Sequence, residues 1–378
     1  MEPKIKILHI IKSLGRGGAE MLLPETLRLH DHARYEFHYI YFLPWKDQMV
    51  GAIREHGGIV TCFDAGNNIK LLLRAKAVAN YVRKHDIQLI HAHLPWAGVL
   101  ARIVGKMTGV PVIYTEHNKQ ERYHFATRLL NLATMNWLTA VVAVSEDVEQ
   151  SIRKYKPTLK APLQTILNGV NTERFAPGYG GSDAVRKAFG IPADAPVIGT
   201  VAVFRFQKRL DLWMETAKEI LKQVPAAHFI IVGDGPLREP LYTRHAELGL
   251  KERVHFAGLQ TEVRPYFATF SLYMMSSIFE GLPIALLEAM SSGCPVVTTD
   301  AGGIKEVVRP DIDGLLCSVD EPEKLVALAA GVLQDEPRRK ALGAQARVRV
   351  QERFSMETMV QGLEQIYEQR RQKSSRMK

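Results

Sequence analysis

Short apolar runs rich in β-branched residues alternate along this chain with amphipathic stretches of helical length. In the first half of the chain these runs read IKILHII, FHYIYFL, IVTCF, IQLIHAH, VPVIYTE, AVVAVS and LQTIL. Strands separated by helix-length segments form βαβ units, and such units build parallel sheets that helices cover on both faces. The alternation therefore predicts an α/β protein.

The alternation stops once, in a stretch rich in Gly, Pro, Asn and Asp, and then restarts. That stretch reads NGVNTERFAPGYGGSDA, and the later runs read PVIGTVAVF, HFIIVGD, VHFAG, FSLYMM and PVVTTD. A chain of 378 residues also exceeds the size at which one core keeps growing. We therefore expect two doubly wound, Rossmann-like domains, over residues 1–172 and 183–354. A C-terminal helix and basic tail follow over residues 355–378, with the first domain as a candidate packing surface.

Composition narrows the class further. Hydrophobic residues make up 46% of the chain and charged residues 24%, which is usual for folded globular proteins. The cysteines Cys62, Cys294 and Cys317 are far apart and form no C-x-x-C pair, so neither a disulfide framework nor a structural zinc site is expected. No apolar run approaches the roughly 18 residues of a membrane span, and we expect a cytoplasmic protein.

The net charge of +9 indicates an anionic partner: phosphate groups, an acidic membrane surface or nucleic acid. Part of this charge lies in the C-terminal QRRQKSSRMK, which we interpret as a frayed end that at most touches anionic lipid. The other basic residues are spread out, and no motif that reads RNA or DNA accompanies them. Nucleic acid is therefore not an expected partner.

The stretch SLGRGGAE, residues 13–20, follows the first apolar run. A dinucleotide-binding G-x-G-x-x-G turn would need a third glycine where Glu20 stands, and an acid at the end of the second strand, which ends in FLP. A bound NAD or FAD is therefore not expected. Gly17 and Gly18 still let the backbone approach a ligand, and the helix that they open presents free N–H groups. The alternative is a plain tight turn.

The most informative stretch is SSIFEGLPIALLEAMSSGCPVVTTDAGGIKEVV. Pro283 suits the first position of a helix, so the backbone N–H groups that follow point toward the preceding loop and form an anion site. These N–H groups belong to Ile284, Ala285 and Leu286. Glu288, one turn further, can accept two hydrogen bonds from a vicinal diol, and Glu280 stands before the helix. The alternative is that both acids are solvated surface residues.

The pair Glu280 and Glu288, framed as FEGLPIALLEAM, resembles the nucleotide-sugar signature of the retaining GT-B glycosyltransferases of family 4 (glycosyl transferases group 1). Further motifs follow the family's order over essentially the whole chain: GGAE, EHN, VSE, NGVN and VGDGP. The resemblance implies two Rossmann-like domains that face a central cleft. It implies transfer of a UDP- or GDP-linked sugar, with retention and without a metal or other cofactor, to a hydroxyl of a glycan or lipid-linked acceptor in cell-surface polysaccharide biosynthesis.

The resemblance also assigns the nucleotide and sugar contacts. Glu288 would bind the nucleotide ribose with Leu259 beside the nucleotide, and Glu280 would contact hydroxyls of the donor sugar.

The resemblance places a basic pair for the diphosphate on the loop VAVFRFQKRLD, which offers Arg205 and Lys208. Lys208 fits the family pattern, whereas the usual arginine falls at Val203, two residues before Arg205. Gly17 and Gly18 would approach the same diphosphate from the first domain.

His117, in YTEHN, ends a predicted strand, and the resemblance places it near the reacting carbon of the donor sugar. There it would orient a hydroxyl or stabilise positive charge. His91 and His93 project to one face of another strand. With His117 they match the ligand count of catalytic zinc. We do not adopt zinc, because cationic side chains and helix dipoles already neutralise the leaving group.

Asp311 and Asp313 form a D-x-D pattern, which other sugar transferases use for manganese. Gly314 and two leucines follow, and this order predicts a turn before a short strand. No metal is therefore expected.

Two other functions stay open: a nucleotide-sugar epimerase of the same architecture, and a non-catalytic protein that binds a nucleotide sugar or a membrane surface. Acceptor contacts are expected from LPWKDQMV and KQERYHFATRLLNLATMNWL. The second segment is either a core-packing helix or an amphipathic helix that touches a lipid-linked acceptor at the inner face of the membrane.

Overall fold

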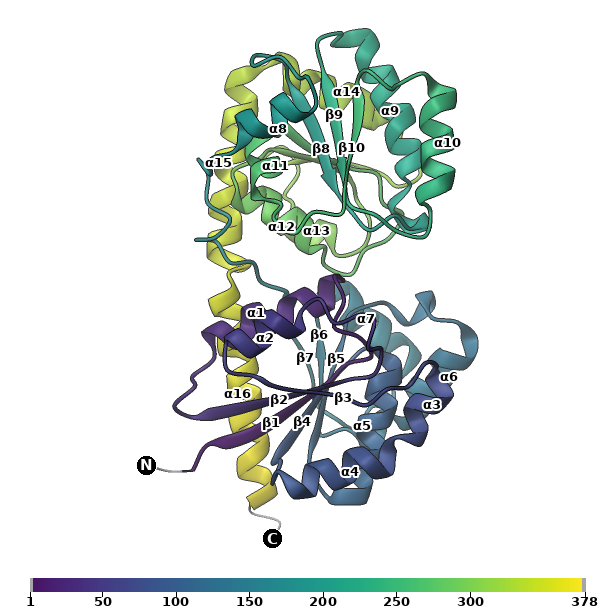
Figure 1. The fold of residues 1–378 in the computed structure, drawn as a ribbon, viewed down its shortest axis with the longest axis vertical. Coiled ribbons are helices and arrows are strands. Elements are labelled where there is room, and N and C mark those ends of the chain that lie inside the picture. Colours follow the sequence, from purple (N-terminus) through teal and green to yellow (C-terminus); the bar gives the residue numbers. More distant parts are fainter. Residues whose placement is uncertain (1–2, 376–378) are drawn as a thin grey trace. The chain divides into compact units, whose positions relative to one another are not determined.

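The computed structural model describes residues 3–375, and side chains as far as Gln369, so the expectation for the basic tail lies outside the described residues. The chain forms two compact units (Figure 1). Unit 1 comprises Met1–Gly169 and Met356–Lys378, and unit 2 comprises Val170–Ser355. None of the helices in the described part is long and apolar enough to cross a bilayer.

Unit 1 is built on a seven-stranded parallel sheet with the order β3-β2-β1-β4-β5-β6-β7. The strands are β1 Ile5–Ile10, β2 Tyr35–Tyr41, β3 Ile59–Cys62, β4 Leu89–His93, β5 Val112–Glu116, β6 Ala140–Ala143 and β7 Leu163–Thr165. The α-helices are α1 Gly18–Leu29, α2 Val50–Glu55, α3 Asn68–Leu73, α4 Ala75–Lys84, α5 Pro95–Thr108, α6 Phe125–Thr134, α7 Glu146–Tyr155 and α16 Met356–Ser375. The strand order reverses between β1 and β4, which is where doubly wound sheets bind ligands.

Unit 2 repeats this plan with six parallel strands in the order β10-β9-β8-β11-β12-β13. The strands are β8 Val197–Val201, β9 His228–Val232, β10 Val254–Gly258, β11 Leu272–Met275, β12 Val296–Thr299 and β13 Leu315–Cys317. The α-helices are α8 Ser182–Ala188, α9 Leu210–Gln223, α10 Arg238–Leu248, α11 Arg264–Thr269, α12 Ile284–Ser291, α13 Ile304–Val307, α14 Lys324–Gln334 and α15 Glu336–Arg353. The order again reverses beside the first strand of the unit, between β8 and β11.

The structure contains every strand that the apolar runs predict. The central strands are buried on both faces, whereas the edge strands β3, β7 and β10 are only partly buried. The predicted turn at Asp311 and Asp313 is also confirmed, directly before β13. The two carboxylates pair with Arg338 (2.9 Å) and Arg309 (2.5 Å). One prediction is wrong by a residue: Pro283, with an extended ψ of 118°, precedes α12 instead of beginning it.

The last helix, α16, packs on unit 1 although unit 2 separates it from that unit in the sequence. Its apolar face is buried and includes Val360, Leu363 and Ile366. The carboxylate of Glu364 accepts a hydrogen bond from the backbone N–H of Asp31 (3.0 Å). The same carboxylate oxygen lies 2.9 Å from the ring of His30. Helix α16 is therefore an integral part of the unit 1 core.

Candidate functional site

An ion pair links two loops of unit 2 at the carboxyl ends of β8 and β11. The Lys208 ammonium lies 2.6 Å from a carboxylate oxygen of Glu280, and these side chains are only 18% and 11% exposed. The hydroxyl of Ser277 donates to the same oxygen at 2.6 Å. The hydroxyl of Ser276 donates to the carbonyl of Lys208 at 2.9 Å. Two residues 72 positions apart, both predicted site residues, are thus held together before any ligand binds.

The motif VGDGP supports the lysine loop from the neighbouring strand. The amide of Phe204 donates to the carbonyl of Asp234 at 3.0 Å. A side chain at Gly235 would place its Cβ only 2.6 Å from the backbone nitrogen of Phe204. Gly233 has a φ of +133°, and a Cβ there would lie 2.0 Å from the carbonyl oxygen of Ala202. Glycine is needed at these two positions because the backbone of the VGDGP loop lies directly against the backbone of residues 202–204.

Helix α12 begins beside this ion pair in the sequence and carries a buried acid. Glu288 lies in its second turn and is buried, so it is not a solvated surface residue. At the start of the helix, the amide of Leu286 already donates to the carbonyl of Pro283 at 3.2 Å. Among the predicted anion contacts, Ile284 and Ala285 therefore offer the amides for a ligand.

Two other predicted contacts of unit 2 lie at its surface. Arg205 is exposed, three residues before Lys208 on the same loop, and Leu259 is exposed after β10. Both stay predicted contacts of the donor.

The glycine loop of unit 1 precedes α1 as expected, but its close neighbour is an acid. A Cβ at Gly17 would lie 2.3 Å from the carboxylate of Glu20, which also accepts a hydrogen bond from Ser13 at 2.9 Å. The Glu20 side chain thus folds over Gly17. A carboxylate at a helix N-terminus is electrostatically favourable, and it takes the position of an anion. The diphosphate contacts of Gly17 and Gly18 stay a prediction.

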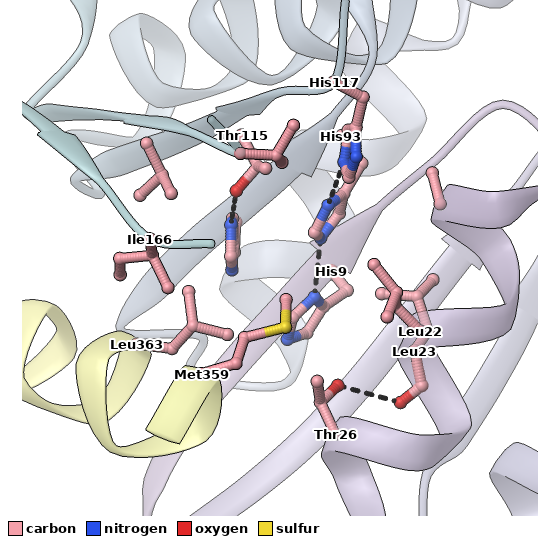
Figure 2. A pocket seen from close by; sticks show the side chains of 14 residues that line it. His9, Leu22, Leu23, Thr26, His93, Thr115, His117, Ile166, Met359 and Leu363 are labelled. Carbon is pink, nitrogen blue, oxygen red and sulfur yellow. Dashed lines mark hydrogen bonds between the residues drawn. The ribbon is translucent and has the colours of Figure 1, made fainter. Parts of the chain in front are cut away.

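Four histidines of unit 1 lie close together on β1, on β4 and directly after β5, and Figure 2 labels His9, His93 and His117. His9 Nδ1 and His93 Nε2 share a hydrogen bond of 3.0 Å, and His93 Nδ1 and His117 Nε2 lie 3.4 Å apart. His91 is bonded differently, to Thr115 at 2.7 Å and to Tyr367 of α16 at 2.8 Å. The sequence predicted the grouping of three of these histidines and missed His9, whose only signal was its position near the end of the first strand.

The four imidazoles border a cavity of about 20 Å³, the size of a single water molecule. Burial lowers the pKa of His9, His91 and His93 well below the ordinary value. Burial also lowers the pKa of His117 to about 4. All four rings are therefore neutral near pH 7.

Three of these histidines raise the question of a metal ion. Within the described residues, ring nitrogens of His9, His91 and His93 lie within 4.8 Å of one another. Both ring nitrogens of His91 and both of His93 are already within hydrogen-bond distance of other side chains. A metal would have to replace those contacts, so the donor set does not favour one.

Glu116 organises the loop that carries His117, although it was not among the predicted site residues. Its buried carboxylate accepts hydrogen bonds from the backbone N–H groups of His117 (3.1 Å) and Asn118 (3.4 Å). Four further side-chain donors surround it: Tyr114, Gln120, Tyr123 and Asn131. Burial raises the pKa of Glu116, and the hydrogen bonds oppose that shift. In the EHN motif, the buried carboxylate of Glu116 thus holds the backbone of His117 in place.

Two family models match the chain one after the other. The model for Glycosyltransferase Family 4 matches residues 16–174, and the model for Glycosyl transferases group 1 matches residues 182–349. A similar curated protein is the UDP-Gal:alpha-D-GlcNAc-diphosphoundecaprenol alpha-1,3-galactosyltransferase of Escherichia coli, 25% identical over 350 residues, or 88% of this chain and 89% of that relative. The N-acetyl-alpha-D-glucosaminyl L-malate synthase of Bacillus anthracis is 28% identical over 306 residues, or 78% of each chain.

A similar solved structure is HepE of Anabaena in complex with UDP and glucose. It matches with a TM-score of 0.86 and 21% identity, over 96% of this chain and 99% of HepE. The two proteins therefore share a fold.

Proposed function

The chain belongs to the glycosyltransferases of family 4, group 1, with the GT-B fold, and we propose that it transfers a sugar from a nucleoside diphosphate sugar to a hydroxyl group with retention of configuration. The observation that carries this proposal is the pair of Lys208 and Glu280 beside the start of α12. A diphosphate needs fixed positive charge and free N–H groups, and a donor sugar needs an acceptor for its hydroxyls. The loop of Lys208, the first amides of α12 and Glu280 supply these functions.

The proposed chemistry uses electrostatics without a metal. Lys208, Arg205 and the start of α12 stabilise the departing diphosphate, and Glu288 holds the ribose. Glu116 is the carboxylate nearest to His117 in the sequence, but it is buried and engaged by six donors, so it is a poor nucleophile. We therefore favour same-face attack by the acceptor, assisted by the leaving phosphate. Activity that survives EDTA supports this mechanism, and loss that manganese restores contradicts it.

We propose a UDP-linked hexose as the donor, with GDP sugars as the alternative. The name of the relative in Escherichia coli includes UDP-Gal, and HepE was solved with UDP and glucose. A ligand that binds only the folded state raises the melting temperature. The test is a thermal-shift screen of UDP, GDP and ADP sugars, followed by an assay of sugar transfer with the donor that binds. A donor that is epimerised without any acceptor would contradict the proposal.

We propose that the acceptor is lipid-linked and that unit 1 touches an anionic membrane. Phe125 and Leu129, one turn apart on α6, are 66% and 58% exposed. Ile69 and Leu73 on α3 are exposed as well, and α3 and α6 both pack on α5. Exposed apolar side chains next to basic ones are typical of interfacial helices. Sedimentation with vesicles that contain phosphatidylglycerol should fall for the double variant Phe125→Ser and Leu129→Ser.

A further inference from the structure

Three imidazoles of unit 1 lie edge to edge in a row that runs from the core to the predicted sugar contact (Figure 2). The rings of His9 and His93 are nearly coplanar, with planes 10° apart and centroids 5.3 Å apart. The facing nitrogens are only 3.0 Å apart, so each nitrogen points at the other and not at a common metal position. This geometry is that of an in-plane hydrogen bond.

A neutral imidazole has one N–H donor and one acceptor nitrogen. In a row of neutral rings, the tautomer of the first ring therefore determines the tautomer of each ring that follows. His9, His93 and His117 are all kept neutral by burial. The proton position on His9 consequently decides which nitrogen of His117 carries hydrogen.

The surroundings of His9 Nε2 decide in which direction the hydrogen bonds of the row run from donor to acceptor. This nitrogen is buried, and no hydrogen-bond partner faces it within the described residues. Buried donors without a partner are rarer than buried acceptors without one, so the proton belongs on His9 Nδ1. His9 Nδ1 then donates to His93 Nε2, and His93 Nδ1 donates to His117 Nε2. His117 is left with its hydrogen on Nδ1, and within residues 3–369 the hydrogen bond of its ring is the one that Nε2 makes with His93.

We propose that His93 and His9 are positioning residues that hold His117 as the Nδ1–H tautomer, so that it donates a hydrogen bond to a hydroxyl oxygen of the donor sugar. The inference rests on the proposed function, because the contact between His117 and the sugar is part of it. Glu116 fixes the backbone of His117, and His93 fixes its ring. Together they prepare one oriented donor before the sugar arrives.

A double-mutant cycle tests whether His93 acts through His117. We expect His93→Phe to lower kcat roughly tenfold with little change in the KM for the donor, the effect of one lost hydrogen bond. In the background of His117→Ala, the same change should alter kcat by less than about twofold. The matched control is His91→Phe, two residues along β4 and outside the row, whose effect should multiply with that of His117→Ala. A tenfold loss that persists without His117 would overturn the proposal.

Two further measurements keep the test decisive. His93→Asn is the second variant: an amide nitrogen near the position of Nδ1 can donate to His117, so this variant should keep most of the kcat of the unmutated protein. Imidazole ¹⁵N spectra of the substrate-free protein should show hydrogen on Nδ1 of His117, and on Nε2 in His93→Phe. Hydrogen on Nε2 in the unmutated protein, or zinc-induced shifts of His9 and His93, would overturn the row. Because the spectra need no activity, a correct tautomer without sugar transfer would contradict only the proposed function.

Discussion

The Lys208 and Glu280 side chains neutralise each other in the ligand-free protein, at a contact distance of 2.6 Å. Under the proposed function, a diphosphate would compete with Glu280 for the ammonium group, and a sugar hydroxyl would then bind to the carboxylate. In this proposal the pair is a preformed site, in which each partner keeps the other oriented until its own part of the donor binds.

The two members of this pair should have opposite effects on nucleotide binding. We expect Lys208→Ala to weaken UDP binding roughly 10-fold to 100-fold, the effect of a charge-assisted hydrogen bond. Glu280→Gln frees the lysine, so UDP should bind at least as tightly while sugar transfer falls. Calorimetric titration with UDP checks both variants, with the exposed α9 lysine in Lys222→Ala as the control. Equal weakening by both variants would contradict the assignment.

The histidines of unit 1 should make the protein sensitive to acid. The pKa of His117 is about 4 in the folded state and near 6.5 when unfolded, so the unfolded state binds more protons between these values. The free energy of unfolding should therefore decrease as the pH falls from about 6.5 to 4. His9, His91 and His93, whose pKa values are also lowered, add to the slope, each by up to about 1.4 kcal/mol per pH unit. Melting curves from pH 7 to 5 measure the effect. A constant melting temperature would show that these rings are not buried as neutral groups.

At the scale of elements, the strands and helices could be predicted from the periodicity of the sequence. The contact between His9 and His93 could not, because it depends on which strands are neighbours in the sheet. Periodicity identifies each strand and helix, and the Glu280 to Glu288 spacing lies within one local segment. His9 and His93 are 84 residues apart and meet only because β1 lies beside β4. No local pattern encodes that neighbourhood. Likewise, the role of Glu116 depends on donors from η1, residues 120–122, and α6 that turn back onto β5.

The contact between the VGDGP loop and the lysine loop should be intolerant of a single methyl group. In Gly235→Ala the new Cβ would meet backbone atoms of Phe204, which cannot move aside as a side chain can. We expect a loss of about 1–3 kcal/mol in stability, together with weaker UDP binding. The control is Gly331→Ala in α14, where nothing lies within 4 Å and where alanine should be neutral or stabilising. Chemical denaturation and UDP titration of both variants test this difference.

For the whole molecule, the division into units predicts that unit 2 folds on its own and that the first segment of unit 1 does not. Unit 2 is one continuous segment with its own buried core around Trp213 and Phe229. Residues 170–355 alone should therefore fold cooperatively and bind UDP. Residues 1–169 alone lack α16 and would expose the apolar surface that Leu363, Ile366 and Tyr367 cover in the longer chain, including His91, the partner of Tyr367. We expect that fragment to be unstable until a peptide of residues 356–375 is added, and circular dichroism melts of the fragments check both outcomes. A stable fragment of residues 1–169 would contradict this view of α16.

The position of α16 also fixes an order of events during synthesis. A ribosome makes the seven strands of unit 1 first, yet it makes the helix that completes their core only after the whole of unit 2. Unit 2 can fold before α16 is made, and during that time the apolar surface that α16 covers in unit 1 is exposed to solvent. Premature termination anywhere before residue 356 thus leaves an incomplete unit 1 that quality-control proteases can recognise, and only a chain that extends through α16 covers that surface.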